Sequence, residues 1–122
     1  MAFHVKETRT TPLVQIDLGE IIIKGRSIPE DSFEFYEPIV DACRAYVLKP
    51  EKHTKVSVHL EYVNSGSKKY LMNIFTILEK SYLEGNGYEI IWFYDIDDES
   101  ILDLGNDLKS IVKVPISIEP SH

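Results

Sequence analysis

The residues with the clearest capacity for chemistry form a polar stretch, Asn-Ser-Gly-Ser-Lys-Lys at residues 64–69. A run with helical spacing of apolar residues follows, so Asn64 or Ser65 is well placed to cap the start of a helix. The free N–H groups at a helix start carry partial positive charge and favour an anion. The stretch therefore predicts a place where a phosphate can sit, on a ligand or covalently on a serine, although turning and capping alone would also explain these residue types.

A second cluster is acidic, because Asp95, Asp97, Asp98 and Glu99 directly follow an apolar run. Carboxylate oxygens are the ligands of Mg²⁺ and Ca²⁺, and the spacing of Asp95 and Asp97 resembles the Asp-x-Asp of phosphoaspartyl hydrolases. The glycine of a calcium-binding loop is missing, however, since Ser100 occupies its place, and Glu99 stands where the hydrolase motif needs a small hydroxyl or β-branched residue. We expect a solvated acidic helix start with no metal, and keep a small metal-dependent hydrolase using Asp95, Asp97 and Asp98 as an alternative.

Two regular elements must position the first cluster. Apolar residues alternate with polar ones over residues 55–63, which predicts a strand with one half-polar face. Helical spacing over residues 67–83 predicts a helix, and Gly85 just beyond it is a suitable terminator. Residues 88–95 are apolar on both faces and predict an interior strand. Because the strand at residues 55–63 has a half-polar face, we expect the helices to share the other face.

The remaining segments complete the pattern. Pro115 indicates that the last strand lies at an edge of the sheet or contains a bulge. Further elements are predicted as strands over residues 13–18, 21–24 and 112–119 and as helices over residues 38–48 and 100–111.

The predicted fold class is therefore α/β (α+β), in the order β-β-α-β-α-β-α-β. It is a five-stranded mixed sheet with three helices in a single domain spanning residues 1–122. Residues 1–12 are predicted to be a flexible lead-in, and residues 120–122 a tail.

Composition narrows the classes of function. The 122 residues include 20 acidic and 13 basic side chains, a net charge of −7, which argues against nucleic acid or an anionic membrane as the main partner. Cys43 is the single cysteine, so no disulfide forms within the chain, and its place on an apolar helix face predicts a buried thiol. Because no signal peptide or membrane-spanning run is recognisable, the predicted compartment is the cytoplasm.

Three motifs are distributed along the chain: Gly-Arg-Ser-Ile-Pro-Glu at residues 25–30, Tyr-Val-Asn-Ser-Gly-Ser-Lys-Lys-Tyr-Leu at residues 62–71, and Trp-Phe-Tyr-Asp-Ile-Asp-Asp-Glu at residues 92–99. Together they resemble the SiaC family of bacterial regulatory phosphoproteins. The resemblance implies a fold similar to the STAS domains of anti-sigma-factor antagonists. It also implies a partner switch that is not an enzyme and needs no cofactor.

In such a switch a kinase-like protein phosphorylates one hydroxyl of the motif at residues 62–71, and a phosphatase removes the phosphate. The unphosphorylated form binds a target, which in the characterised system is a diguanylate cyclase that it activates. The family's acceptor threonine corresponds to Ser65, with Ser67 as the alternative acceptor. The resemblance implies that partner-binding residues are Asn64, Ser65, Gly66, Ser67, Lys68, Lys69, Arg26 and Tyr62.

Three functions thus remain open. The leading one is the switch, in which a phosphate on Ser65 adds a charge of about −1.5 to −2 at a helix start that tolerates it. A partner would then have to desolvate a dianion, and binding would be lost. The others are the hydrolase and a constitutive interaction scaffold that uses exposed aromatic side chains of the sheet. The sequence leaves the oligomeric state and the identity of the target open.

Overall fold

The computed structural model describes residues 2–121, and these contain six strands and three helices. The strands are β1 (Phe3–Val5), β2 (Leu13–Asp17), β3 (Glu20–Ser27), β4 (His53–Val63), β5 (Gly87–Asp95) and β6 (Ile116–Ser121). The helices are α1 (Ser32–Leu48), α2 (Ser65–Leu83) and α3 (Glu99–Ile111).

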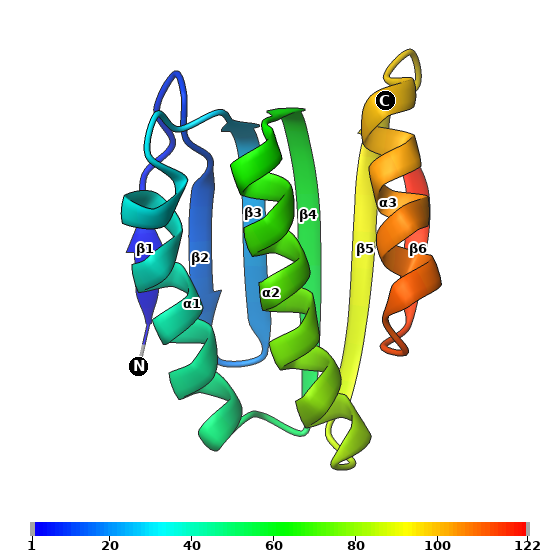
Figure 1. Cartoon of the computed structure of the whole chain (residues 1–122). Coiled ribbons are helices and arrows are strands. Elements are labelled where there is room, and N and C mark those ends of the chain that lie inside the picture. Colours follow the sequence, from blue (N-terminus) through cyan, green and yellow to red (C-terminus); the bar gives the residue numbers. More distant parts are fainter. Residues whose placement is uncertain (1, 122) are drawn as a thin grey trace.

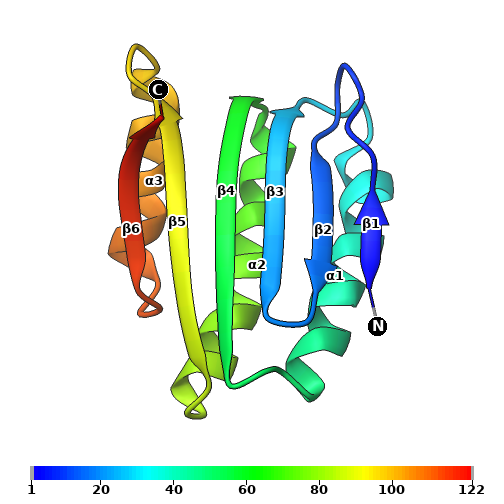
Figure 2. The same ribbon diagram turned by 180° about the vertical axis from the view of Figure 1, so that it is seen from behind.

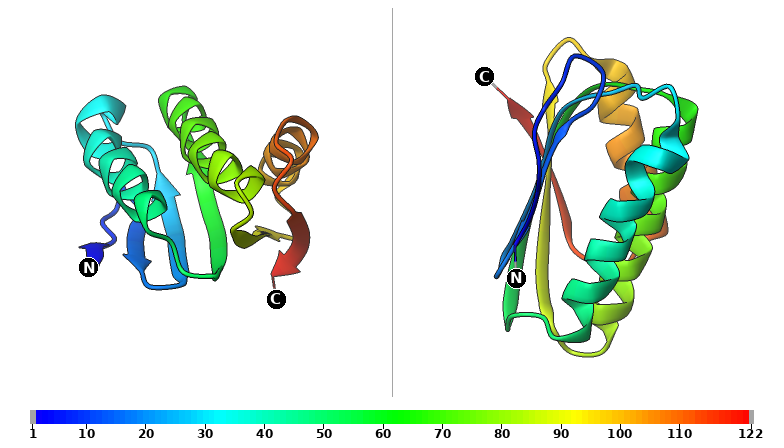
Figure 3. Two further views of the ribbon diagram at one scale, coloured as in Figure 1. Left: turned by 90° about the horizontal axis from the view of Figure 1, so that it is seen from below. Right: turned by 90° about the vertical axis from the view of Figure 1, so that its left-hand side faces the viewer.

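The strands form one mixed sheet in chain order (Figures 1 and 2). The β1/β2 and β2/β3 pairs are antiparallel, and β3, β4, β5 and β6 run parallel to one another. All three helices cover the same face of the sheet, as the edge-on view in Figure 3 shows, and the other face is uncovered. This agrees with the half-polar face predicted for β4. Because α2 follows directly after β4, its start lies at the carboxyl ends of the parallel strands.

The predicted mixed fold with three helices is confirmed, but the sheet has six strands where five were predicted. The extra strand lies in the segment predicted to be a flexible lead-in, because β1 pairs with β2 and places Phe3 opposite Ile16. Three residues are too few to show a strand periodicity, so only the tertiary pairing reveals β1. The segment beyond β1 is also fixed, since the Thr8 N–H donates to the Thr11 carbonyl over 2.9 Å. Met1 lies outside the described residues.

Helix starts and the chain end also differ from prediction. Helix α1 begins at Ser32, before the predicted start at Pro38, because the Asp31 carboxylate accepts from the Glu34 N–H over 3.0 Å and caps it. Pro38 then lies inside the helix. The predicted tail is part of β6 as far as Ser121, and His122 lies outside the described residues.

The core lies between the sheet and the helices. Helix α2 buries Leu71, Ile74, Phe75 and Leu78 against the sheet, and each such side chain contributes about 1.5–3 kcal/mol by leaving water. The Trp92 ring is fully buried and its Nε1–H donates to the Ile101 carbonyl of α3 over 2.9 Å.

Cys43 is buried as predicted, and burial raises the pKa of its thiol to about 12. A thiol with so high a pKa stays protonated near neutral pH and is a poor nucleophile. Among residues 2–121, none of the helices is both long and apolar enough to cross a membrane.

Candidate functional site

The polar stretch at residues 64–69 is the start of α2, and Asn64 is its cap. The Asn64 Oδ1 atom accepts from the Ser67 N–H over 2.9 Å, while its Nδ2 donates to the Pro29 carbonyl over 3.1 Å. One side chain thus closes the first turn of α2 and ties it to the loop that follows β3. Because Asn64 supplies the cap oxygen, the Ser65 hydroxyl is not needed for that purpose.

The two candidate acceptor hydroxyls differ in access. Ser65 is the first residue of α2 and its side chain is exposed. Ser67 is fully buried: its hydroxyl donates to the Ser27 carbonyl over 3.0 Å and accepts from the Ser27 hydroxyl over 2.8 Å. The Tyr36 hydroxyl also hydrogen-bonds to the Ser27 hydroxyl. A kinase can therefore reach Ser65 from solvent, whereas reaching Ser67 would require the helix start to open.

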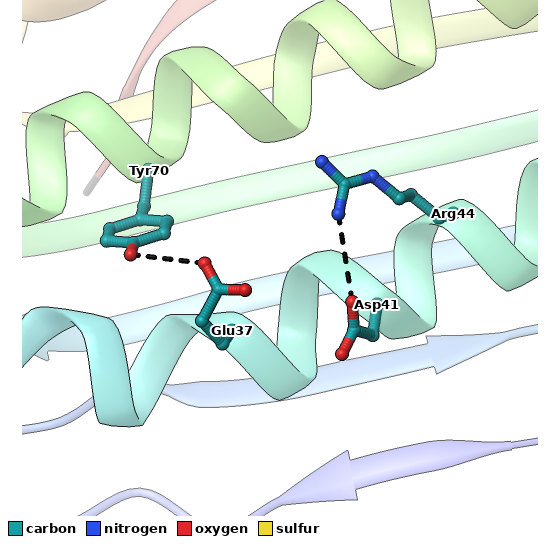
Figure 4. A network of polar contacts seen from close by, with 4 residues as sticks. All are labelled: Glu37, Asp41, Arg44 and Tyr70. Carbon is teal, nitrogen blue, oxygen red and sulfur yellow. Dashed lines mark hydrogen bonds and ion pairs between the residues drawn. The ribbon is translucent and has the colours of Figure 1, made fainter.

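The same point of the fold holds α1 against α2. A Cβ atom on Gly66 would lie 2.3 Å from the Ser32 Oγ, so only glycine allows the two helix starts to approach this closely. The rings of Tyr36 and Tyr70 are stacked, with 5.3 Å between their centres and 7° between their planes. Figure 4 shows the next contact, in which the Tyr70 hydroxyl of α2 donates to Glu37 of α1 over 3.2 Å.

Figure 4 also shows an Asp41–Arg44 ion pair on α1, with the atoms 3.7 Å apart. Both side chains are largely exposed, so this pair contributes little to stability. The packing of α1 on α2 near Ser65 therefore depends on the buried hydroxyls and the stacked rings, which fix the backbone that presents Ser65.

The charged side chains beside Ser65 on α2 itself are basic. In the described chain its first turn contains no acidic side chain, and Lys68 and Lys69 are exposed beside Ser65. Residues three and four positions apart are neighbours on a helix surface. A dianion on Ser65 would therefore meet two ammonium groups as well as the free N–H groups of the helix start.

A cleft of about 710 Å³ separates this site from the acidic run. Tyr62, Val63 and Lys68 form one side, and the acidic side chains with Ile101 and Leu104 of α3 form the other. Within residues 2–121 no group of three or more His, Cys, Asp and Glu side chains is arranged to hold a metal ion.

Two of these carboxylates have other contacts. Asp98 caps α3 by accepting from the Ile101 N–H over 3.1 Å, and an Asp95 oxygen lies 3.1 Å from the His59 Nε2. Asp98 thus begins α3 as its cap, and the acidic run is the start of that helix.

Arg26 and Tyr62, also predicted to bind a partner, lie together at the ends of β3 and β4. The Arg26 guanidinium carbon stands 5.8 Å from the centre of the Tyr62 ring, and both side chains are exposed. The structure therefore brings Arg26, Tyr62 and the start of α2 to the same end of the sheet. Sequence reasoning missed the supporting hydroxyls of Ser27 and Tyr36, because they meet Ser67 only in the folded chain, where Ser27 lies 40 residues before Ser67.

Comparisons with known proteins find a family model, a relative of similar length and solved structures that match this chain. A family model described as SiaC family regulatory phosphoprotein matches residues 5–121. An uncharacterized protein of Pseudomonas aeruginosa strain UCBPP-PA14 is 26% identical over 118 residues, which are 95% of this chain and 94% of that protein.

Solved structures of a member of this family have the same fold as this chain. The SiaC chain in a crystal structure of the P. aeruginosa diguanylate cyclase SiaD with its activator SiaC has a TM-score of 0.90 and 26% identity, covering 98% of this chain and 99% of that one. Apo-SiaC from the same organism has a TM-score of 0.89 and 25% identity, with 98% of both chains covered. Because the alignments span nearly the whole of each chain, the likeness is to the complete fold, helices as well as sheet.

Proposed function

Because the chain belongs to the SiaC family of regulatory phosphoproteins, we propose that it is a partner switch controlled by phosphorylation of Ser65. The unphosphorylated form binds and regulates a target protein, and phosphorylation releases it. The target that we propose is a diguanylate cyclase, because the related SiaC of P. aeruginosa is the activator of such an enzyme. The switch itself has no catalytic activity or cofactor and works in the cytoplasm, with a kinase and a phosphatase as its other partners.

The observation that carries this proposal is the difference between the two hydroxyls of one helical turn. Ser65 is exposed at the start of α2, while Ser67 is buried and engaged with Ser27. The first turn also suits the product of the reaction, because Lys68, Lys69 and the helix dipole all favour a dianion. Phosphorylation would therefore leave the fold intact and change only the surface.

Loss of binding then follows from solvation. A target that packs against the neutral Ser65 hydroxyl removes little hydration from it, whereas packing against a phosphate requires removal of the water around a dianion. Unless the target offers matching cations, that penalty exceeds the gain from the contact. The surface that we assign to the target comprises the exposed parts of residues 64–69, with Arg26 and Tyr62 beside them.

The site is tested with protein recovered from the cells that make it. Intact-mass and fragment mass spectrometry should find one phosphate on the wild type, located on Ser65, and none on Ser65→Ala. Ser100→Ala is the matched control, since Ser100 is an exposed serine in the first turn of α3, and its phosphate content should equal that of the wild type. A phosphate on Ser67 or Ser100 in the wild type would refute the assignment.

Binding is tested separately by calorimetry with purified diguanylate cyclases of the source organism. We expect one of them to bind the dephosphorylated protein and to bind the phosphorylated form at least tenfold more weakly. Equal binding of both forms would favour the constitutive scaffold over the switch.

A further inference from the structure

The backbone at Tyr62 is in a conformation that tyrosine rarely adopts. Its φ angle is +51°, the one positive value at a residue other than glycine among residues 2–121. The left-handed region brings the Cβ atom close to the following carbonyl oxygen, so glycine or asparagine is normal there and a bulky residue is an outlier. Strain of this kind persists only where the surrounding structure enforces it, and it concentrates at functional sites.

A β-bulge causes the conformation. Arg26 of β3 pairs with Glu61 of β4, but the next residue, Ser27, pairs with Val63. Tyr62 is therefore the additional residue of β4, and only Val63 separates it from Asn64, the cap of α2. A bulge re-aims a side chain that regular alternation would direct elsewhere, and here the re-aimed side chain is an aromatic one.

Burial does not compensate this strain. Tyr62 is 64% exposed, and within residues 2–121 the one cation–π contact is that of its ring with the Arg26 guanidinium, 5.8 Å from the ring centre. An exposed stack of this type stabilises the fold weakly, and glycine would fit the bulge with less strain. Folding alone gives no reason for a tyrosine at this position.

The surroundings of Tyr62 have the anatomy of a protein interface. Arg26 holds the ring, and the ring borders the 710 Å³ cleft whose wall includes Val63, Ile101 and Leu104. Asp95, Asp97 and Glu99 lie at the same cleft and are exposed, where they can stay hydrated as a polar rim. An apolar centre with a polar rim is the usual arrangement at an interface, and tyrosine and arginine are typical of its strongest contacts.

We propose that Tyr62 is the anchor of the target interface, held outward by the bulge, and that an apolar side chain of the target enters the cleft between the Tyr62 ring and α3. This inference rests on the proposed function, because the target is the diguanylate cyclase assigned above. Arg26 is a positioning residue that fixes the ring before the target arrives. Lys68, one helical turn from Ser65, lies on the same cleft, so a phosphate on Ser65 adds its charge beside the apolar contact.

The test separates the backbone from the side chain with three substitutions at one position. Tyr62→Gly and Tyr62→Ala remove the ring, but only glycine relieves the strain, so Tyr62→Gly should melt about 4 °C above Tyr62→Ala. Tyr62→Phe keeps the ring. Leu18→Ala is the control, because Leu18 is similarly exposed at 62% and lies in the β2–β3 turn at the opposite end of the sheet.

Binding is measured by calorimetry between each dephosphorylated variant and the purified diguanylate cyclases of the source organism. Tyr62→Phe and Leu18→Ala should bind within threefold of the wild type, and Tyr62→Gly and Tyr62→Ala at least tenfold more weakly. Wild-type affinity in Tyr62→Gly, or a melting point of Tyr62→Gly below that of Tyr62→Ala, overturns the anchor and leaves the proposed function standing. If the wild type binds none of the cyclases, the proposed function itself fails and the anchor with it.

Discussion

Helices α2 and α3 begin at the same end of the sheet and are capped in the same way, yet their charges are opposite. Asn64 caps α2 with an amide oxygen, and Asp98 caps α3 with a carboxylate. Within the described residues, the first turn of α2 has no acidic side chain, whereas that of α3 contains Glu99. Helix α1 resembles α3, because Asp31 caps it and Glu34 lies in its first turn.

This difference shows where a reversible charge can be added. A helix start favours negative charge, and α1 and α3 already have permanent carboxylates there. Helix α2 has a neutral cap, an exposed serine and two lysines instead. A phosphate on Ser65 would therefore supply the negative charge that the start of α2 lacks. A phosphate on Ser100 of α3 would instead add to existing negative charge. Substitutions at matched positions of α2 and α3 test this difference.

The largest expected effect concerns the glycine that fits each helix against its neighbour. A Cβ atom on Gly105 would lie 2.4 Å from Cδ1 of the buried Trp92 ring. Since that ring has no room to move, Gly105→Ala should lower the free energy of unfolding by about 3 kcal/mol.

Gly66→Ala should lower the free energy of unfolding less, by about 1.5 kcal/mol. The Ser32 hydroxyl can rotate away, but the Ser32 Cβ atom, 2.8 Å from the new Cβ atom, forces the two helix starts to shift apart slightly. Alanine offsets part of this loss because it favours a helix. Urea unfolding measures both variants. Equal losses of unfolding free energy in the two variants would mean that the start of α2 packs against α1 as tightly as α3 packs against Trp92.

The next prediction compares the cap of α2, Asn64, with the cap of α3, Asp98. Asn64→Ala removes both the cap bond and the bond to the Pro29 carbonyl, so it should lower the free energy of unfolding by about 2 kcal/mol. Asp98→Ala removes only a cap bond and should lower it by about 1 kcal/mol.

Asp98→Asn retains a cap oxygen and serves as the control, with stability close to that of the wild type in urea unfolding. If Asn64→Ala lowers the free energy of unfolding no more than Asp98→Ala does, the hydrogen bond to the Pro29 carbonyl contributes nothing to stability.

Residue types alone predicted that a helix begins near residues 64–69, but not which side chain caps it. Asn64 and Ser65 both suit a cap, and only the tertiary contact with Pro29 decides for Asn64. The burial of Ser67 depends on Ser27, which is 40 residues away. A signal was present, however, because Ser67 lies four residues before Leu71 and hence on the apolar face of α2.

The start of α1 was also predictable from a signal in the sequence. Asp31 followed by Glu34 three residues later is a capping pattern, and it is a better guide than Pro38, which favours but does not fix a first turn. By contrast, β1 has no local signal, since its three residues become a strand only by pairing with β2. The strain at Tyr62 likewise arises from a register shift between β3 and β4, which no single segment encodes.

The smallest expected effect tests the charge difference directly. Ser65→Asp places a carboxylate at the start of α2, within reach of Lys68 and Lys69, and should raise the free energy of unfolding by about 0.5 kcal/mol. Ser100→Asp adds the same group beside Glu99, with Asp103 three residues further along α3, so like-charge repulsion should cancel or reverse the gain.

Thermal unfolding at low and high salt measures both variants. The difference between them should shrink in 1 M NaCl, where exposed charges are screened over about 3 Å. Equal stabilisation of the two helices would remove the electrostatic reason for placing the switch on α2. A difference that salt abolishes would support the start of α2, rather than that of α3, as the place for a phosphate.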